Sequence, residues 1–224
     1  AFRFGQARAS ERSCLMAERT VEDRLREEYF KLLPDIRFAS EQLETKIRHC
    51  VLPVSRRPDK HEQVIVTSRI KDCESAIDAL RRDKEVRKFN QEQPDLYTLT
   101  DLKDLAGVRV LVFPEARLHE LNATLAEQFS DWVPNHVMDA EESGDPLAFT
   151  YYGRLDAVTN VFAEFQVVSM LIGQFWDVEH SVMYKPSPQY RGVARSLEMQ
   201  ECTHNVYRAL KEFEKTFEKL IESP

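Results

Sequence analysis

The sequence predicts an α+β fold in which a mixed β-sheet of about five strands is flanked by helices and extended by helices at both ends. Three observations favour this class. Short apolar runs of strand length occur between turn residues. Between and outside these runs, apolar residues recur at helical spacing. The two kinds of segment do not alternate regularly as βαβ units would, which argues against a doubly wound parallel sheet.

The amino-terminal part is predicted to be mostly helical. Residues 1–14 contain arginines and little apolar periodicity, so we expect a loose basic arm. Apolar positions over 16–47 predict one or two amphipathic helices, broken near Pro34 because proline removes a helical hydrogen bond. A short strand over 63–67 and a helix over 73–82 follow.

The second half is predicted to complete the sheet. We expect, in chain order, a buried strand over 108–113, a helix over 116–128, a short strand over 132–138, paired strands over 149–158 and 161–168, a helix over 170–184 and a final helix with the apolar stripe Val206, Leu210, Phe213, Phe217 and Leu220. The stripe is expected to pack on the domain, and a dimer contact is left open. The chain then divides into the arm at 1–14, a main domain at 15–190 and a helical extension at 191–224.

Composition narrows the class of protein. The chain has 224 residues, enough for one core, and 42% hydrophobic with 31% charged residues predicts a soluble globular protein. A net charge of −7 argues against broad nucleic-acid binding. The four cysteines are widely spaced, which favours free thiols in the reducing cytoplasm over a zinc site or disulfides. No apolar run is long enough to span a bilayer, and the missing initial methionine favours a fragment of a longer chain.

Two carboxylates fall at predicted buried strands. Asp104 comes just before the strand at 108–113, and Glu164 lies within the strand at 161–168. A carboxylate beside apolar residues is costly unless a cation meets it, and a hard divalent metal is the usual candidate. The pair therefore predicts phosphate chemistry.

A basic turn is the second candidate element. Arg69, Lys71 and Ser75 fall where the strand at 63–67 leads into the next helix. A helix start offers free backbone N–H groups and arginine can bind phosphate oxygens in bidentate fashion, so this turn suits a polyphosphate. Taken alone, a solvated surface is the more common explanation for such a turn.

A third cluster lies on one face of the predicted helix at 170–184. Trp176, Glu179, His180 and Met183 are spaced i, i+3, i+4 and i+7, so they share that face. Taken alone, a buried histidine satisfied by glutamate or by backbone is the simpler interpretation.

Four segments, in order, resemble the synthetase domain of the RelA/SpoT alarmone synthetases, especially the small single-domain members. They are TSRIKDCES at 67–75, DLAGVRV at 104–110, AEFQV at 163–167 and FWDVEHSVMYK at 175–185. The resemblance implies a nucleotidyltransferase-like fold. It also implies transfer of the β,γ-pyrophosphate of ATP to the 3′-hydroxyl of a nucleotide, with GDP or GTP as the first expectation and an adenine nucleotide as the second.

The resemblance also assigns roles to residues. It implies that Arg69 and Arg109 sandwich the donor adenine, that Lys71 and Ser75 contact the donor phosphates, that Asp104 and Glu164 are catalytic and hold Mg²⁺, and that Tyr151, Gln166 and His180 bind the acceptor. Tyr151 would stack on the acceptor base, and Glu164 matches a carboxylate credited with metal binding or with activation of the attacking hydroxyl.

The acceptor half departs from the family pattern. The family loop reads Gly-Tyr-x-Ser-x-His, and residues 150–155 read TYYGRL, in which only the tyrosine survives. Ala79 replaces a lysine and Val168 an arginine of the family, and an acidic loop at 139–145 stands where relatives often have lysine. A negative loop should weaken binding of a highly charged acceptor.

These departures leave other readings open. One is a toxin-type relative that pyrophosphorylates adenine nucleotides or the 3′ ends of tRNA, alongside a neutralising partner protein. Another is a catalytically inactive module that senses nucleotides or binds a partner. The expected ligands are ATP and an acceptor nucleotide, with tRNA as the only nucleic acid considered and no membrane. Homo-oligomerisation is left open.

Overall fold

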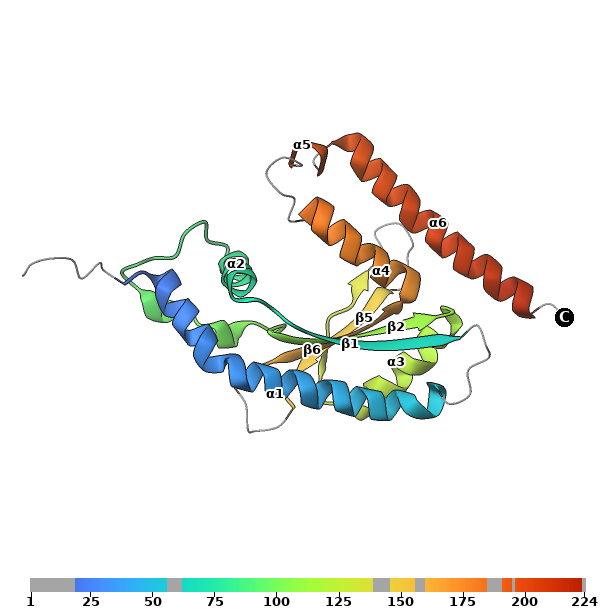
Figure 1. Cartoon of the computed structure of the whole chain (residues 1–224), viewed down its shortest axis with the longest axis horizontal. Helices are drawn as coiled ribbons and strands as arrows, with labels where there is room; N and C mark the ends of the chain where they lie inside the picture. Colours follow the sequence, from blue (N-terminus) through green and yellow to red (C-terminus); the bar gives the residue numbers. More distant parts are fainter. Residues whose placement is uncertain are drawn as a thin grey trace, which may run out of the picture.

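A mixed β-sheet forms the centre of the computed structural model, and helices lie on both of its sides (Figure 1). The structure describes residues 19–55, 62–138, 146–155, 160–184, 191–194 and 196–222. The strands are β1 (Gln63–Ile70), β2 (Ala106–Phe113), β3 (Val133–Pro134), β4 (Val137–Met138), β5 (Pro146–Gly153) and β6 (Ala163–Ser169). Their order is β1-β2-β6-β5-β3, with β4 also paired to β5; β2 and β6 are parallel and the other pairs antiparallel. The predicted α+β class is confirmed, with six strands in the sheet.

The helices divide between the two faces of this sheet. They are α1 (Val21–Ser55), α2 (Cys73–Asp83), α3 (Ala116–Gln128), α4 (Met170–Glu179), α5 (Arg191–Ala194) and α6 (Leu197–Glu222), with short 3-10 turns η1 (Pro94–Leu96) and η2 (Leu99–Asp101) and a π-helical turn η3 (His180–Tyr184). The long α1 runs along one side, whereas α4 and α6 lie on the other (Figure 1). The predicted helices at 73–82 and 116–128 are confirmed.

The predicted break near Pro34 is wrong, because α1 continues through it as one helix of 35 residues. Pro34 is exposed, and Phe30, whose carbonyl loses its helical partner, is 64% exposed. Water can therefore replace the missing hydrogen bond. The apolar stripe continues on the buried side, where Ile36 and Leu43 are fully buried.

Several boundaries differ from the prediction. β1 runs three residues further than expected, because its last residues stay paired with β2 as far as Ile70 opposite Ala106. β5 starts at Pro146 rather than at 149, and the segment 132–138 holds two short strands instead of one. The α-helix predicted over 170–184 ends at Glu179 and continues as the π-helical turn. The arm at 1–14 lies outside the described residues.

The main core lies between the sheet and the helices α1 and α3. Side chains of β2 and β6 that point to this side are buried among α1 and α3, notably Val108, Val110 and Phe165. Their spacing of two residues is the period of a strand with one face on the core. The same strands consequently present the intervening residues to the opposite face.

That opposite face is covered only in part. Leu111 and Val168 pack there against Met170 and Ile172, at the start of α4. The other half of this face, toward the beginning of β2 and β6, carries polar side chains. The uncovered half is where the predicted functional residues gather.

A buried carboxylate attaches α6 to the sheet. Glu214 is fully buried, and the hydroxyl oxygen of Ser169 lies 2.7 and 2.8 Å from its two carboxyl oxygens. Burial raises the pKa of Glu214 to about 7. The apolar stripe of this helix packs only partly, as Leu210 contacts the cluster under α4 while Phe213 and Leu220 are 54% and 71% exposed.

β1 forms one edge of the sheet, and α1 covers part of that edge. Arg48 of α1 donates a hydrogen bond of 2.6 Å from Nη2 to the carbonyl oxygen of Val66 in β1. Cys50, Cys73 and Cys202 are free thiols, and Cys14 lies outside the described residues. Within the described ranges, no helix is long and apolar enough to cross a membrane.

Candidate active site

The strand register places the predicted residues on one face of the sheet. Arg69 of β1 is opposite Gly107 of β2, and Glu164 of β6 is opposite the same glycine from the other side. Arg109 is opposite Gln166. Directly paired residues project from the same face, so this register sets two arginines and a carboxylate side by side.

Gly107 gives Arg69 its room. A Cβ at this position would lie 3.3 Å from Cγ of Arg69 and 3.4 Å from its Nε. Arg69 has no hydrogen-bond or ion-pair partner among the residues that the structure describes. A side chain at 107 would therefore press on an arginine whose guanidinium is otherwise available to a ligand.

Arg109 is held in place by several contacts. Its Nη1 donates to Oδ1 of Asp177 at 2.8 Å and to the carbonyl oxygen of Gly173 at 3.4 Å, and its Nε donates to Oε1 of Gln166 at 3.3 Å. Its guanidinium carbon lies 6.0 Å from the ring centre of Trp176. Gly173 also permits close packing of α4, because a Cβ there would lie 2.4 Å from Cδ2 of Leu111.

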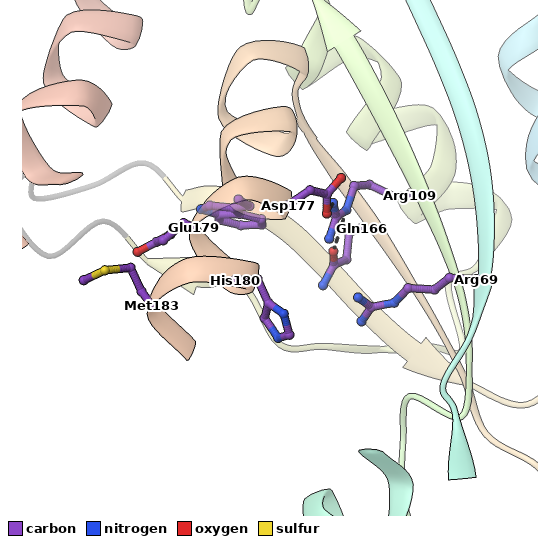
Figure 2. A pocket seen from close by; sticks show the side chains of 8 residues that line it. Arg69, Arg109, Gln166, Asp177, Glu179, His180 and Met183 are labelled. Carbon is purple, nitrogen blue, oxygen red and sulfur yellow. Dashed lines mark hydrogen bonds and ion pairs between the residues drawn. The ribbon is translucent and has the colours of Figure 1, made fainter. Parts of the chain in front are cut away.

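A cavity of about 490 Å³ opens between these arginines and α4 (Figure 2). It is lined by Arg69, Arg109, Gln166, Trp176, Asp177, Glu179, His180 and Met183. Trp176, Glu179, His180 and Met183, which were predicted to share one helix face, all line this cavity, with Met183 in the π-helical turn. Arg69 and Arg109 are diagonal cross-strand neighbours, which in sheets lie roughly 7–8 Å apart, and a flat ring in contact on both sides needs about that gap.

A second cavity of about 350 Å³ adjoins the first, since Arg69 and His180 line both. Its other lining residues are Ile70, Lys71, Asp72, Ser75, Arg82 and Asp104. Ser75 lies in the first turn of α2, where its backbone N–H donates to Oδ1 of Asp72 at 2.9 Å. The cavity therefore combines several cations with the amino end of a helix, the end that favours anions.

The two predicted carboxylates lie in different electrostatic surroundings. Asp104 makes an ion pair with Nζ of Lys71. Burial and the nearby charge of Asp104 raise the pKa of Glu164 to about 7, while Arg69 and Lys71 act in the opposite direction. Glu164 also accepts a hydrogen bond of 3.0 Å from Nε2 of Gln166. Glu164 can therefore gain and lose a proton near neutral pH.

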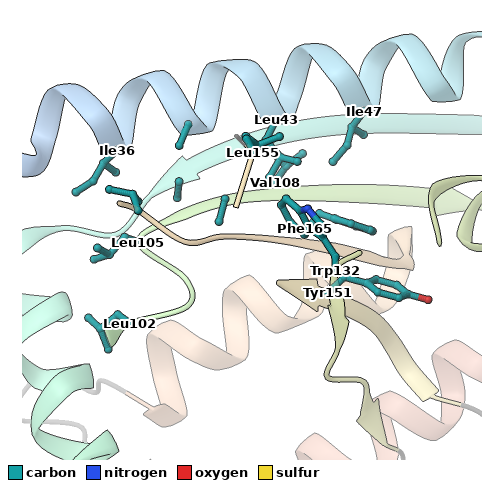
Figure 3. Packing of buried hydrophobic residues seen from close by; sticks show 14 of the residues in the cluster. Ile36, Leu43, Ile47, Leu102, Leu105, Val108, Trp132, Tyr151, Leu155 and Phe165 are labelled. Carbon is teal, nitrogen blue, oxygen red and sulfur yellow. The ribbon is translucent and has the colours of Figure 1, made fainter. Parts of the chain in front are cut away.

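Tyr151 is the predicted site residue that the structure places elsewhere (Figure 3). It lies on the core face of β5, where its ring stacks on Phe165 at 4.9 Å between centroids and its hydroxyl donates to Oδ1 of Asn122 at 3.0 Å. The expected stacking of Tyr151 on an acceptor base does not fit this burial. The next residue, Tyr152, is opposite Glu164 and so projects from the site face.

Asp177 and Tyr152 were not predicted to belong to the site. Asp177 follows Trp176 in sequence, and a carboxylate on the helix that faces Arg109 was the available signal. For Tyr152 the signal was strand alternation, because Phe149 and Tyr151 fall on one face and Thr150 and Tyr152 on the other. The other predicted site residues line the two cavities or lie directly beside them.

The fold and cleft define an α+β domain whose mixed sheet presents arginines and a carboxylate pair to two joined cavities. Solved structures that share the fold include small alarmone synthetases. Small alarmone synthetase 1 from Bacillus subtilis matches with a TM-score of 0.62 at 19% identity, over 88% of this chain and 100% of that one. Its complex with pppGpp matches at 0.61 and 19%, over 87% and 99%. A GTP pyrophosphokinase family protein from Streptococcus pneumoniae matches at 0.62 and 18%, over 86% and 92%.

No protein-family model and no curated protein matches the sequence. At identities of 18–19% the likeness establishes the fold. The RelA/SpoT-type synthetase fold that the four motifs predicted is therefore confirmed.

Proposed function

We propose that the protein is a pyrophosphokinase that transfers the β,γ-pyrophosphate of ATP to the 3′-hydroxyl of an acceptor nucleotide. One observation carries the proposal: the two cavities meet at Arg69 and His180, directly beside the pair Asp104 and Glu164. The first cavity has two arginines that suit a nucleobase, and the second has the cations that suit phosphates. The fold is shared with a synthetase solved with AMPCPP and with its product pppGpp.

The donor would span both cavities. Arg69 and Arg109 would hold the adenine between their guanidinium planes, which stack on aromatic faces better than a lysine does. The phosphates would then enter the second cavity, toward Lys71 and Ser75 at the start of α2. Arg82 lines this cavity and supplies a cation on the helix where Ala79 replaces the lysine of relatives.

A magnesium ion fits this site by the chemistry of the oxygen donors. Protein-bound Mg²⁺ is commonly held by one or two carboxylates together with substrate phosphates. Asp104 and Glu164 offer such a pair, and no cluster of three or more His, Cys, Asp or Glu in the described ranges could hold a metal alone. A metal held there would neutralise charge on the transferred phosphates. Lys71, now paired with Asp104, is close enough to take part in the same neutralisation.

Glu164 is the proposed general base. Its pKa of about 7 suits proton removal at neutral pH, because a base works best when its pKa is near the working pH. The carboxylate must be ionised to accept the hydroxyl proton. Because kcat/KM reports the enzyme before Mg²⁺ and the nucleotides bind, we expect it to rise with pH up to about 7 and then to level off.

The test is AMP release from ATP and Mg²⁺ with GDP, GTP, ADP, ATP or bulk tRNA as acceptor, with the product mapped at its 3′-oxygen. We expect AMP to form in step with a pyrophosphorylated guanine nucleotide. AMP release with tRNA alone would instead assign the toxin-type reaction. Nucleotide binding without AMP for every acceptor would refute the proposal and leave the inactive module.

A further inference from the structure

A separate cavity of about 470 Å³ lies on the core face of the sheet, away from the cleft. It is bounded by the second half of α1, by the end of α3 with the turn that follows it, and by the end of β5. Its volume is close to the 490 Å³ of the cavity beside Arg69 and Arg109, and it falls in the range of small-molecule sites. No residue that lines it has a role in the proposed reaction.

The inner wall of this cavity is apolar. Phe129, Trp132 and Leu155 line it, and all three side chains are buried. The rings of Phe129 and Trp132 meet edge to face, with 5.0 Å between their centroids. Figure 3 shows Trp132 and Leu155 on the side of the sheet that faces α1. A wall of aromatic and aliphatic side chains favours an apolar ring as the ligand.

Gly153 allows Trp132 to take this position. A Cβ at Gly153 would lie 2.5 Å from Cγ of Trp132, so the indole can lie against β5 only because this residue is glycine. Gly153 and Leu155 are also two of the positions at which residues 150–155 depart from the alarmone synthetase pattern. The departures from the family's acceptor loop therefore help to form this cavity.

The rim of the cavity carries basic side chains. Lys46 and His49 lie about one turn apart on α1, and Arg154 directly follows β5. All three are exposed, and none makes a hydrogen bond or ion pair within the ranges that the structure describes. Asp131 is the only carboxylate among the described residues that line the cavity. With His49 neutral, the rim therefore has a small positive charge, although the chain as a whole has a net charge of −7.

The indole N–H of Trp132 is a further donor that the protein leaves unused. Trp132 is 6% exposed, and its N–H makes no hydrogen bond with any residue that the structure describes. The N–H of a buried tryptophan usually has an acceptor. An oxygen atom of a ligand in the cavity would supply one.

We infer that this cavity is a second ligand site, for a small aromatic monocarboxylate, and the inference does not depend on the proposed function. The ring of the ligand packs on Phe129 and Trp132. Its carboxylate accepts hydrogen bonds from the indole N–H and from the cations of the rim, Lys46 and Arg154. The small positive charge of the rim suits one carboxylate better than a nucleoside triphosphate, whose several charges would also meet Asp131.

The test measures binding of the probe 2-naphthoate to the whole chain by calorimetry. Lys46→Gln and Arg154→Gln are compared with Lys31→Gln and Arg37→Gln, which remove the same charges from exposed positions on α1. We expect the Kd to rise about tenfold in each cavity variant, the value of one hydrogen bond to a charged group. The controls should bind as wild type does. Unchanged melting temperatures would show that the variants are folded.

Two cysteines locate the bound probe. Cys50 is a half-buried free thiol that lines the cavity, whereas Cys202 is exposed on α6. At ten times its Kd, 2-naphthoate should slow alkylation of Cys50 by iodoacetamide about tenfold, because only the unoccupied protein reacts. Alkylation of Cys202 should not change. Peptide mass analysis measures both rates in one sample.

Two further ligands test the chemical class. 2-Naphthamide has the same ring without the charge, and it should bind wild type about as weakly as 2-naphthoate binds the cavity variants. GTP should not protect Cys50. Protection of Cys50 by GTP, or amide binding as tight as that of the carboxylate, would contradict the choice of a monocarboxylate.

Three results would overturn the site itself. They are no binding of 2-naphthoate at millimolar concentration, binding that leaves Cys50 as reactive as before, and a Kd that is equal in the cavity variants and the controls. All three can be obtained whether or not AMP release confirms the proposed function.

Discussion

The two faces of the central sheet are built by the same strands and do opposite things. On β2, Val108 and Val110 point into the core beneath α1, whereas Gly107 and Arg109 point into the cleft beneath α4. The only difference between the two sets is a step of one residue along the strand. Because side chains alternate, the packing that fixes one face also fixes the position of every group on the other.

The faces also differ in how ionisable groups fare. The core face contains apolar side chains, and their burial stabilises the fold. On the other face, Glu164 is in surroundings that disfavour its charge, which raises its pKa to about 7. The packed apolar face therefore fixes the position of a polar face on which an ionisable group has a shifted pKa, as functional sites often require.

The largest expected effect comes from the carboxylates of the cleft face. Asp104→Asn and Glu164→Gln should each lower kcat by on the order of 10³-fold, because one removes metal-binding charge and the other the base. Steady-state AMP release measures the loss. Glu127→Gln, at an exposed position on α3, and Asp95→Asn are the matched controls and should retain full activity. Activity near wild type in either cleft variant would remove the basis for the proposed roles.

The adjacent tyrosines of β5 test the comparison most directly. Tyr151→Ala should lower the free energy of unfolding by roughly 3 kcal/mol, because it opens a cavity against Phe165. Tyr152→Ala should change stability by less than about 1 kcal/mol and raise the acceptor KM about tenfold, because its ring is on the cleft face opposite Glu164, where it would stack on the acceptor base. Urea unfolding and acceptor titration give the two readouts. If the effects were exchanged, the assignment of the two faces at β5 would be wrong.

Glu214 is a buried carboxyl group on α6, and its burial disfavours the charged form. Because folding raises the pKa of this carboxyl group, the protein loses stability as the pH rises from 4.5, the ordinary pKa of glutamate, to about 7. The loss in the free energy of unfolding is roughly 3 kcal/mol at most. Glu115 and Glu218 both act to raise the pKa of Glu214.

Glu214→Gln should therefore match wild type near pH 5 and be more stable by roughly 1–3 kcal/mol at pH 8. Denaturant unfolding at both values checks the prediction, with Glu127→Gln as a control of equal charge change. A difference between variant and wild type that is the same at both pH values would contradict it.

The smallest expected effect concerns the glycine beneath Arg69. Gly107→Ala places a methyl group 3.3 Å from Cγ of Arg69, so the arginine must move by a few tenths of an ångström. We expect the KM for ATP to rise several-fold, with the acceptor KM unchanged, since Arg69 serves the donor in the proposed function. Substrate titrations of both nucleotides distinguish this from a general loss of folding, which would lower kcat with both.

Much of the fold followed from local patterns. The helices at 73–82 and 116–128 and the buried strand at 108–113 have clear periodicity and clear stops, so their positions were predictable. Helix α1 does not break at Pro34, because Pro34 lies on the solvent side, where water can replace the lost helical hydrogen bond. Which side faces solvent is decided by packing far away in sequence.

The site was predictable where the motif residues lie on strands whose side chains alternate between a buried face and the cleft face. Arg69, Arg109 and Glu164 fall on one face by register, and the sequence motifs had grouped them. Tyr151 was expected to bind the acceptor from its place in the motif, but the strand register puts it on the core face, opposite Phe165. Lys103 could not be predicted as a neighbour of Phe162, since only the folded sheet brings these distant positions together.

The strand that carries Arg69 has one further consequence for how the protein behaves in concentrated solution. β1 is an edge strand, and an open edge is a template on which another molecule can add a strand. Arg48 occupies the carbonyl of Val66 on that edge, which removes one point of attachment. The same strand carries Arg69, so the α1 side chain that covers this edge also shields the strand on which the donor site is built.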